Sequence, residues 1–526
     1  MCSDETVAYG EEIWQMNPYV FEPEKPVVET KLGKVRGVTY GNCNIFMGLP
    51  YAKAKRFEMP EELEPWEGVK DCFSHGPIAP QINKVVPFPI YRGLHLLQRE
   101  GENCQNLNIW APVSLNDRRM PVFVWIHGGG YFAGNALEEY SFEGLHLANY
   151  GGIVFVSINH RLNVLGHLNL DEYGGQFAHS VNAGIADLVL ALKWIHENIA
   201  AFGGDPDNVT ICGHSGGGGK VQCLYNVEEA APYFQRGICL SGAMGDRDEG
   251  AEEKSHAFAR QVVSELGLAK ETIGQIQEIP YEALAEACRQ ADRKLHFGPM
   301  IFSPVKDDFF HGNILSAGFM PWSADKPMLF GSTLGEFPLV NLTTDQKDAM
   351  SQDDRLTYVK SLFGDHGDEM VELFKRAYPN HDILDLAYTD FRVRIPTVET
   401  ALMHARNGQN NTYVYNVTYD APENGWIPLW HGGDVCYIFR NQDRVYVLNE
   451  AIYGNRLENI FSNLVLSFAR TGDPNNRFLP EWKPMTAEHR NTMMIDRTSS
   501  CREAYDEELV RGIETYGPKF TFHIDL

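Results

Sequence analysis

The sequence predicts an α/β protein in which helices flank a mostly parallel central sheet, and three observations support this. Residues 121–126 (PVFVWI) and 153–158 (IVFVSI) are short apolar runs rich in β-branched residues, as buried strands are. Residues 182–202 carry apolar side chains at intervals of three and four, which is typical of a helix. Strands that alternate with helices form parallel sheets with both faces covered, because each helix returns the chain across the sheet.

Further short runs extend this pattern in both directions. Residues 209–212, 236–240, 327–330 and 412–419 are expected to be additional strands. Residues 28–46 alternate between apolar and polar side chains and contain turn glycines, which indicates a small antiparallel start to the sheet.

The whole chain, residues 1–526, is expected to form one large domain, because no repeat or low-complexity linker divides it. Two charged, helix-prone stretches, at residues 246–290 and 340–400, interrupt the alternation of strands and helices. We interpret them as helical insertions that cover the active site.

The charge and composition exclude several classes of function. The net charge is −25, which would repel nucleic acid and anionic membrane surfaces. No apolar stretch is long enough to cross a bilayer, so no membrane partner is expected. The first residues (MCSDETVAYGEEIW) lack the basic and apolar regions of a secretory signal, and we therefore expect a cytoplasmic protein.

The strongest catalytic motif is Gly-His-Ser-Gly-Gly at residues 213–217, which matches the pattern G-x-S-x-G. It follows an expected strand and precedes a helix-compatible run, the context in which a serine hydroxyl projects from a cramped turn. Glycines two residues before and after the serine let the backbone segments approach closely. The motif predicts that Ser215 is a nucleophile, whereas a serine in an ordinary glycine-rich turn is the alternative.

A phosphate-binding loop is a second interpretation of the same region, because Gly218, Gly219 and Lys220 form a Gly-Gly-Lys run. The residue five positions before Gly219 is His214 rather than glycine. Val221 follows the lysine, where a serine or threonine would hold Mg²⁺. Both departures exclude a phosphate-binding loop.

His-Gly-Gly-Gly at residues 127–130 directly follows the expected strand at 121–126. Such a run is typical of an oxyanion hole, in which backbone amides stabilise a negatively charged tetrahedral intermediate. We expect Gly129, Gly130 and Gly216 to supply these amides, and one lost donor costs about 3–4 kcal/mol. The neighbouring Tyr131 either shapes the acyl pocket or packs in the core.

Several stretches follow the order found in one known family. They include FMGLPYAKA (46–54), ENCQNLNIW (102–110), WIHGGGYFAGNA (125–136) and ENIAAFGGDPDNVTICGHSGGGGKV (197–221). The sequence resembles the type B carboxylesterases, which include cholinesterases and bacterial para-nitrobenzyl esterases. This resemblance implies the α/β-hydrolase fold and hydrolysis of small-molecule carboxylic esters through an acyl-enzyme, with no metal or organic cofactor.

Two departures from the family lie beside the serine. His214 stands where the family usually has glutamate or glutamine, and it either tunes the site electrostatically or packs. Gly216 stands where the family often has alanine, and its amide remains available. In secreted members the cysteine that corresponds to Cys104 forms a disulfide, but no cysteine occurs near residues 76–81, where its partner would lie. The resemblance therefore implies a free Cys104.

The resemblance also indicates the base and the acid. A serine nucleophile needs a histidine to accept and return its proton, and a carboxylate to orient that histidine. His431 lies in Trp-His-Gly-Gly-Asp after the expected strand at 412–419, which resembles the family's loop that carries the base. Glu336, just past the expected strand at 327–330, resembles the family's acid, and Asp308 is the alternative.

Some functional alternatives remain open at this point. Trp430 either lines the alcohol side of the site or packs in the core. The bond that is cleaved in the natural substrate is either an ester or an amide or carbamate, because the same triad cleaves all three. A non-catalytic binding protein on this fold is the alternative from another class, and the presence of Ser215, Glu336 and His431 argues against it. The sequence predicts no oligomeric state.

Overall fold

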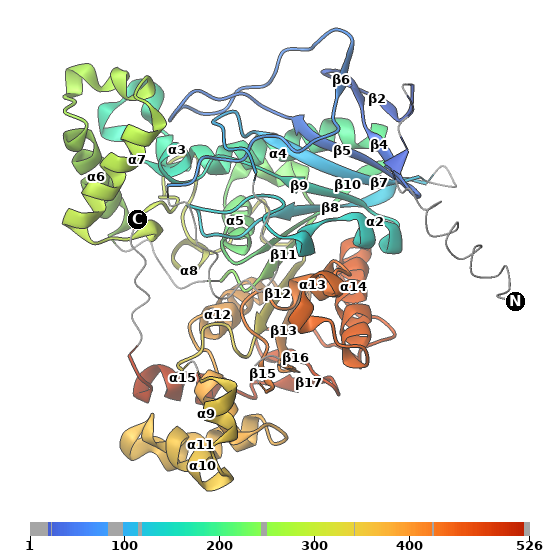
Figure 1. The fold of residues 1–526 in the computed structure, drawn as a ribbon, viewed down its shortest axis with the longest axis vertical. Helices are drawn as coiled ribbons and strands as arrows, with labels where there is room; N and C mark the ends of the chain where they lie inside the picture. The colour runs from blue at the N-terminus through green and yellow to red at the C-terminus, as the bar shows by residue number, and fades with distance from the viewer. Residues whose placement is uncertain are drawn as a thin grey trace, which may run out of the picture.

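The computed structural model describes residues 24–82, 98–113, 118–243, 250–340, 342–422 and 425–519, together with residues 19, 20, 22 and 526. Within these ranges a mixed sheet of twelve strands runs through the molecule in the order β1-β4-β5-β7-β9-β8-β10-β11-β12-β13-β16-β17 (Figure 1). Its centre is parallel, as the sequence predicts. The parallel strands are β9 (Val154–Ile158), β8 (Met120–Ile126), β10 (Gly204–His214), β11 (Arg236–Leu240), β12 (Met328–Thr333), β13 (Thr412–Val417) and β16 (Asn491–Ile495).

Antiparallel strands close both ends of the sheet. These are β1 (Tyr19–Val20), β4 (Val38–Tyr40), β5 (Cys43–Pro50) and β7 (Asn106–Pro112) at one end and β17 (Ser500–Glu503) at the other. The antiparallel start expected at residues 28–46 is divided between two sheets. β4 and β5 join the main sheet, whereas β2 (Val27–Thr30) and β3 (Gly33–Arg36) form a separate three-stranded sheet with β6 (Val69–Asp71).

Strand β8 shows why both faces of the sheet are covered. Phe123 and Trp125 point into a core with α2 (Leu145–Gly151) and α14 (Tyr453–Thr471). Val122, Val124 and Ile126 point the other way, against α4 (Ala183–Asn198) and α5 (Gly216–Tyr225). Successive side chains of a strand lie on opposite faces, so an entirely apolar strand requires helices on both sides.

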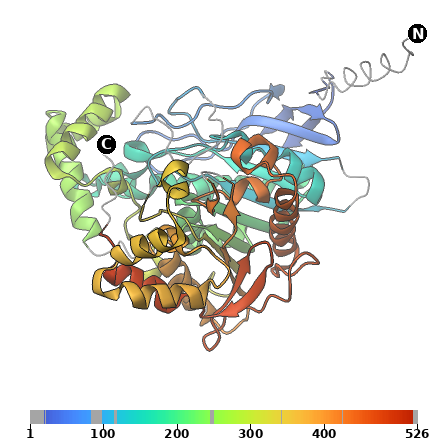
Figure 2. The same cartoon turned by 60° about the horizontal axis from the view of Figure 1, so that its bottom comes forward.

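Two helical segments extend beyond the sheet at the expected insertions (Figure 1). The first contains α6 (Ala251–Glu265) and α7 (Tyr281–Leu295), which share a core with α3 (Asn163–His167). The second contains α9 (Thr344–Asp348), α10 (Gln352–Ser361), α11 (Gly367–Ala377) and α12 (Arg394–Ala405). Figure 2 shows α11 beside the last helix, α15 (Glu507–Tyr516). Residues 246–249 and 341 of the expected insertions 246–290 and 340–400 lie outside the described residues.

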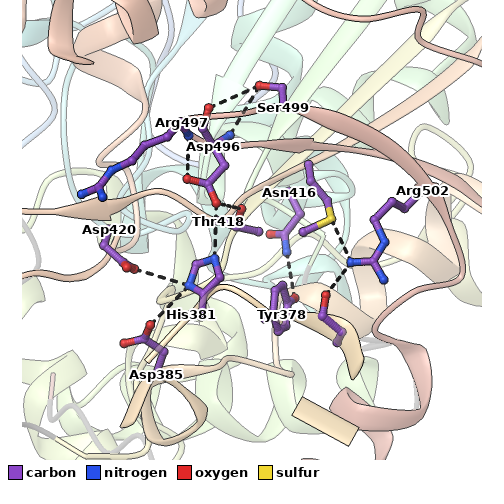
Figure 3. A network of polar contacts seen from close by, with 12 residues as sticks. Tyr378, His381, Asp385, Asn416, Thr418, Asp420, Asp496, Arg497, Ser499 and Arg502 are labelled. Carbon is purple, nitrogen blue, oxygen red and sulfur yellow. Dashed lines mark hydrogen bonds and ion pairs between the residues drawn. The ribbon is translucent and has the colours of Figure 1, made fainter. Parts of the chain in front are cut away.

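A partly buried polar network attaches the second insertion to the ends of β13 and β16 (Figure 3). His381 Nδ1 lies 3.3 Å from Asp385 Oδ2 and 3.8 Å from Asp420 Oδ1, and His381 Nε2 lies 3.3 Å from Asp496 Oδ2. Burial alone would lower the pKa of His381, but the hydrogen bonds to Asp385 and Asp496 and the charge of Asp420 raise it to about 10. The imidazolium therefore links three segments that are distant in sequence.

None of the helices in the described ranges combines the length and the apolar composition needed to cross a bilayer.

A second buried ion pair, between Arg161 and Asp187, gives a stability prediction. Asp187 accepts hydrogen bonds from Arg161 Nε at 2.9 Å and Nη2 at 2.7 Å, and both side chains are buried. Replacing Asp187 with alanine leaves the guanidinium charge buried and unpaired. We expect Asp187→Ala to lower the free energy of unfolding by about 3–5 kcal/mol, measured by urea denaturation.

The exposed pair between Arg260 and Glu172 provides the matched control. Glu172→Ala should change the free energy of unfolding by less than about 1 kcal/mol, because solvent screens this pair. Equal effects of the two substitutions would contradict the assignment of Arg161–Asp187 as a stabilising contact.

Candidate active site

Ser215 lies in the strand–turn–helix context that the motif predicts. Strand β10 ends at His214 and helix α5 begins at Gly216. Ser215 has φ 55° and ψ −126°, a left-handed backbone conformation that costs a non-glycine residue about 1–3 kcal/mol. Its amide donates to the carbonyl of Leu240 at 2.8 Å, which fixes the strained turn against the end of β11.

The glycines around Ser215 are required by backbone packing. A Cβ atom on Gly213 would lie 2.2 Å from the carbonyl carbon of Gly217, and one on Gly217 would lie 2.1 Å from the oxygen of Ile126. A Cβ atom on Gly216 would lie 2.2 Å from the oxygen of Gly130, which accounts for glycine at this position. The start of α5 therefore packs directly on the end of β8 and the loop that follows.

That loop carries the expected amide donors. Gly129 and Gly130 have φ of 79° and 61°, a region that favours glycine. Their amides donate to no acceptor within the described part of the chain. The amide of Gly216 is in the first turn of α5 and has no partner within the helix. Gly130 and Gly216 line one cavity together with Ser215.

The acid and the base expected from the sequence lie in contact. Glu336 follows β12 and is fully buried, and its Oε2 accepts a hydrogen bond from His431 Nδ1 at 2.5 Å. Its Oε1 accepts hydrogen bonds from Ser241 Oγ at 2.5 Å and from the amide of Thr333 at 2.8 Å. Both carboxylate oxygens of Glu336 are therefore held in place.

The alternative acid, Asp308, is far more exposed. Its side chain is 87% exposed and pairs with His179 at 3.4 Å. An exposed carboxylate that pairs with another histidine does not orient His431, so the geometry favours Glu336.

The ring of His431 packs against His214, the residue that precedes Ser215. The ring centroids of His214 and His431 lie 4.5 Å apart, and Phe337 packs on His431 at 4.6 Å. Nε2 of His431 is buried and has no hydrogen-bond partner among the described residues, Ser215 included. Burial and the charge of His431 lower the pKa of His214 well below its usual range, so this imidazole packs as a neutral ring.

The other two candidate substrate-binding residues differ in position. Tyr131 lines the cavity of Ser215, and its hydroxyl lies 3.5 Å from Cys223 Sγ. Trp430 is buried in the core on the opposite side of the sheet from α5, and it is not among the described residues of the cavity wall.

Sequence reasoning missed much of the site. Ser241 follows the expected strand at 236–240, and this position at a strand end is the one signal that could have indicated it. The segment at residues 300–315 supplies much of the cavity wall, and helices α5 and α12 supply further residues. The wall includes Gln222, Met300, Ser303, Pro304, Phe310, Asn313, Ile314, Leu315 and Thr400.

Two groups of side chains have ligand atoms close enough together to hold a metal ion. One consists of His179, Asp307 and Asp308, and the other of His381, Asp385 and Asp420. Neither group contributes a residue to the described cavity wall at Ser215.

Comparison with known proteins agrees with this geometry. Residues 24–511 match the sequence model of the carboxylesterase family. The para-nitrobenzyl esterase of Bacillus subtilis (strain 168) is 28% identical over 490 residues, which cover 89% of this chain and 94% of that protein. The phenmedipham hydrolase of Pseudarthrobacter oxydans is 28% identical over 494 residues, which cover 90% of this chain and 95% of that protein.

A solved structure is similar over nearly the whole chain. It is an esterase from anaerobic Clostridium hathewayi that can hydrolyse aliphatic aromatic polyesters. It has a TM-score of 0.88 and 36% sequence identity, covering 95% of this chain and 99% of that one. The chain therefore belongs to the carboxylesterase family, has the α/β-hydrolase fold and is a carboxylic ester hydrolase.

Proposed function

We propose that the protein cleaves carboxylic esters of small molecules through an acyl-enzyme on Ser215, with His431 as the base and Glu336 as the acid. The observation that carries the proposal is the buried hydrogen bond from His431 Nδ1 to Glu336. Because Nδ1 holds the proton, the unpartnered Nε2 bears the lone pair that can accept the proton of Ser215.

The reaction then proceeds in two halves. Ser215 Oγ attacks the ester carbonyl and transfers its proton to His431, and the amides of Gly129, Gly130 and Gly216 stabilise the oxyanion. The tetrahedral intermediate expels the alcohol, which takes the proton from His431. Water attacks the acyl-enzyme with His431 again as base, and this step releases the acid and restores the serine.

Glu336 orients the imidazole of His431 and stabilises its positive charge, and it does not itself accept the proton. The hydrogen bonds from Ser241 and from the Thr333 amide hold its Oε1, which leaves Oε2 directed at His431. A fixed carboxylate keeps the imidazole in the required tautomer and favours the imidazolium that forms during attack.

We also propose that residues 1–526 form one domain whose two insertions cover the site. Thr400 on α12, at the end of the second insertion, lines the cavity of Ser215. The segment that connects the first insertion to β12, including Phe310, lines it as well. Tyr131 and Phe310 give this wall an apolar part, which suits a hydrophobic acyl or alcohol group.

The first test separates Glu336 from Asp308. Hydrolysis of p-nitrophenyl butyrate should be lost in Ser215→Ala. Glu336→Gln should lower kcat by about 10⁴-fold, because the amide no longer holds the catalytic tautomer. Asp308→Asn should leave kcat unchanged. Full activity in Ser215→Ala, or equal losses in Glu336→Gln and Asp308→Asn, would refute the proposed roles.

The second test concerns the backbone packing at the nucleophile. Gly217→Ala places a Cβ atom 2.1 Å from the Ile126 oxygen, and neither backbone segment can yield without moving the turn. A displacement of this kind should lower kcat by about 10²-fold. Gly274→Ala is the control, because nothing lies within 4 Å of its Cβ position. Steady-state assays that find the two variants equally active would exclude the packing argument.

A further inference from the structure

We infer that Lys220 is a positioning residue for the oxyanion hole: its ammonium holds the carbonyl of His127 and places a positive charge beneath the loop that carries the amide donors. The inference rests on the proposed function and names a further residue that serves it. Lys220 belongs to neither the triad nor the cavity wall.

The position of Lys220 connects the two halves of the site. It lies on α5, five residues after Ser215, and its side chain is fully buried. Its Nζ donates a hydrogen bond of 3.1 Å to the carbonyl oxygen of His127, the residue just before the three glycines. The helix that begins at the nucleophile is thereby attached to the first residue of the oxyanion loop.

The charge of Lys220 has no ion-pair partner. Within the described residues no carboxylate lies within ion-pair distance of its Nζ, and the His127 carbonyl is its one acceptor for three N–H donors. Buried lysines are rare without a paired charge. A buried, unpaired ammonium beneath the oxyanion loop is therefore available to interact with negative charge that develops above it.

The histidines that face Lys220 do not compete for this role. Nδ1 of His127, His160 and His167 donates to the carbonyls of Gly128, Arg161 and Val181 at 2.8–2.9 Å. Burial lowers the pKa of all three, and the charge of Lys220 lowers it further. These three rings come from the segment after β8, the segment after β9 and α3, and they are neutral, so Lys220 is the cation among them.

Three other titratable side chains lie near Lys220: those of Tyr131, Glu138 and Cys223. The ring of Tyr131 lies 5.9 Å from Nζ, and Cys223 is on the same helix. Glu138 is half-buried, and its buried Oε2 has no hydrogen-bond partner in the described chain. Desolvation of the carboxylate and the charge of Glu139 raise its pKa to about 7. Glu138 therefore does not neutralise Lys220 below this pH.

The arrangement predicts the sign of a pH effect. Burial lowers the pKa of Lys220 to about 7. Below this pH the ammonium stabilises the oxyanion, and as the pH rises through it the positive charge is lost. Ionisation of Glu138 adds negative charge over the same range, which acts in the same direction. The value of kcat should therefore decline on the alkaline side, with an inflection near pH 7.

The test compares Lys220→Met, Lys220→Arg and the control Lys326→Met across the pH range, with p-nitrophenyl butyrate as substrate. Lys326 also donates to a backbone carbonyl, that of Phe234 at 2.9 Å, but it lies outside the described cavity wall. Lys220→Met should lower kcat about tenfold on the acid side, with little change in KM, and should lose the part of the alkaline inflection that Lys220 causes. Lys220→Arg should keep kcat and reduce the inflection to the part that Glu138 causes, because arginine does not deprotonate in this range. Lys326→Met should keep the profile of the unsubstituted protein.

The outcomes separate the inference from the proposed function. Activity that survives Ser215→Ala contradicts the proposed function. A Ser215-dependent enzyme whose Lys220→Met profile equals that of the unsubstituted protein overturns the inference alone. If circular dichroism shows that Lys220→Met does not fold, Lys220→Arg provides the test. An alkaline inflection in Lys220→Arg as large as that of the unsubstituted protein overturns the inference.

Discussion

The site depends on one steric constraint: four backbone segments meet at distances that no Cβ atom permits. The end of β8, the glycine loop after it, the end of β10 and the first turn of α5 contact one another through Gly130, Gly213, Gly216 and Gly217. The parallel pairing of β10 with β8, in which Gly213 lies opposite Ile126, sets this contact. The strained turn at Ser215 persists because the surrounding sheet fixes it on both sides.

The parallel strands of the sheet place the other residues of the candidate site at the same edge. Four groups follow the carboxyl ends of β8, β10, β11 and β12, which are consecutive neighbours in the sheet: the glycine loop at residues 127–130, Ser215, Ser241 and Glu336. Parallel strands end at a common edge, so four segments that are distant in sequence arrive together. His431 comes from the loop after β15 (Ile427–Pro428), and Gly335 bridges to the adjacent Trp430, which brings Glu336 and His431 together.

The sequence predicted the parts of the molecule that have local patterns. Apolar runs indicated the parallel strands, and the glycine motifs indicated the surroundings of Ser215, because short-range backbone requirements restrict residue type. The choice between Glu336 and Asp308 needed the structure, since burial distinguishes the two carboxylates and composition does not. The cavity wall and the His381 network could not be predicted, because both join irregular segments through contacts that leave no periodicity.

The most direct test of the account is covalent labelling of the nucleophile with a fluorophosphonate, followed by peptide mapping by mass spectrometry. The serine hydroxyl would attack phosphorus and displace fluoride, which leaves one stable phosphonyl group. The account predicts that a single label appears on Ser215 and that esterase activity falls in proportion to labelling. Activity that persists when Ser215 is fully labelled, or that disappears with the label on another residue, would contradict it.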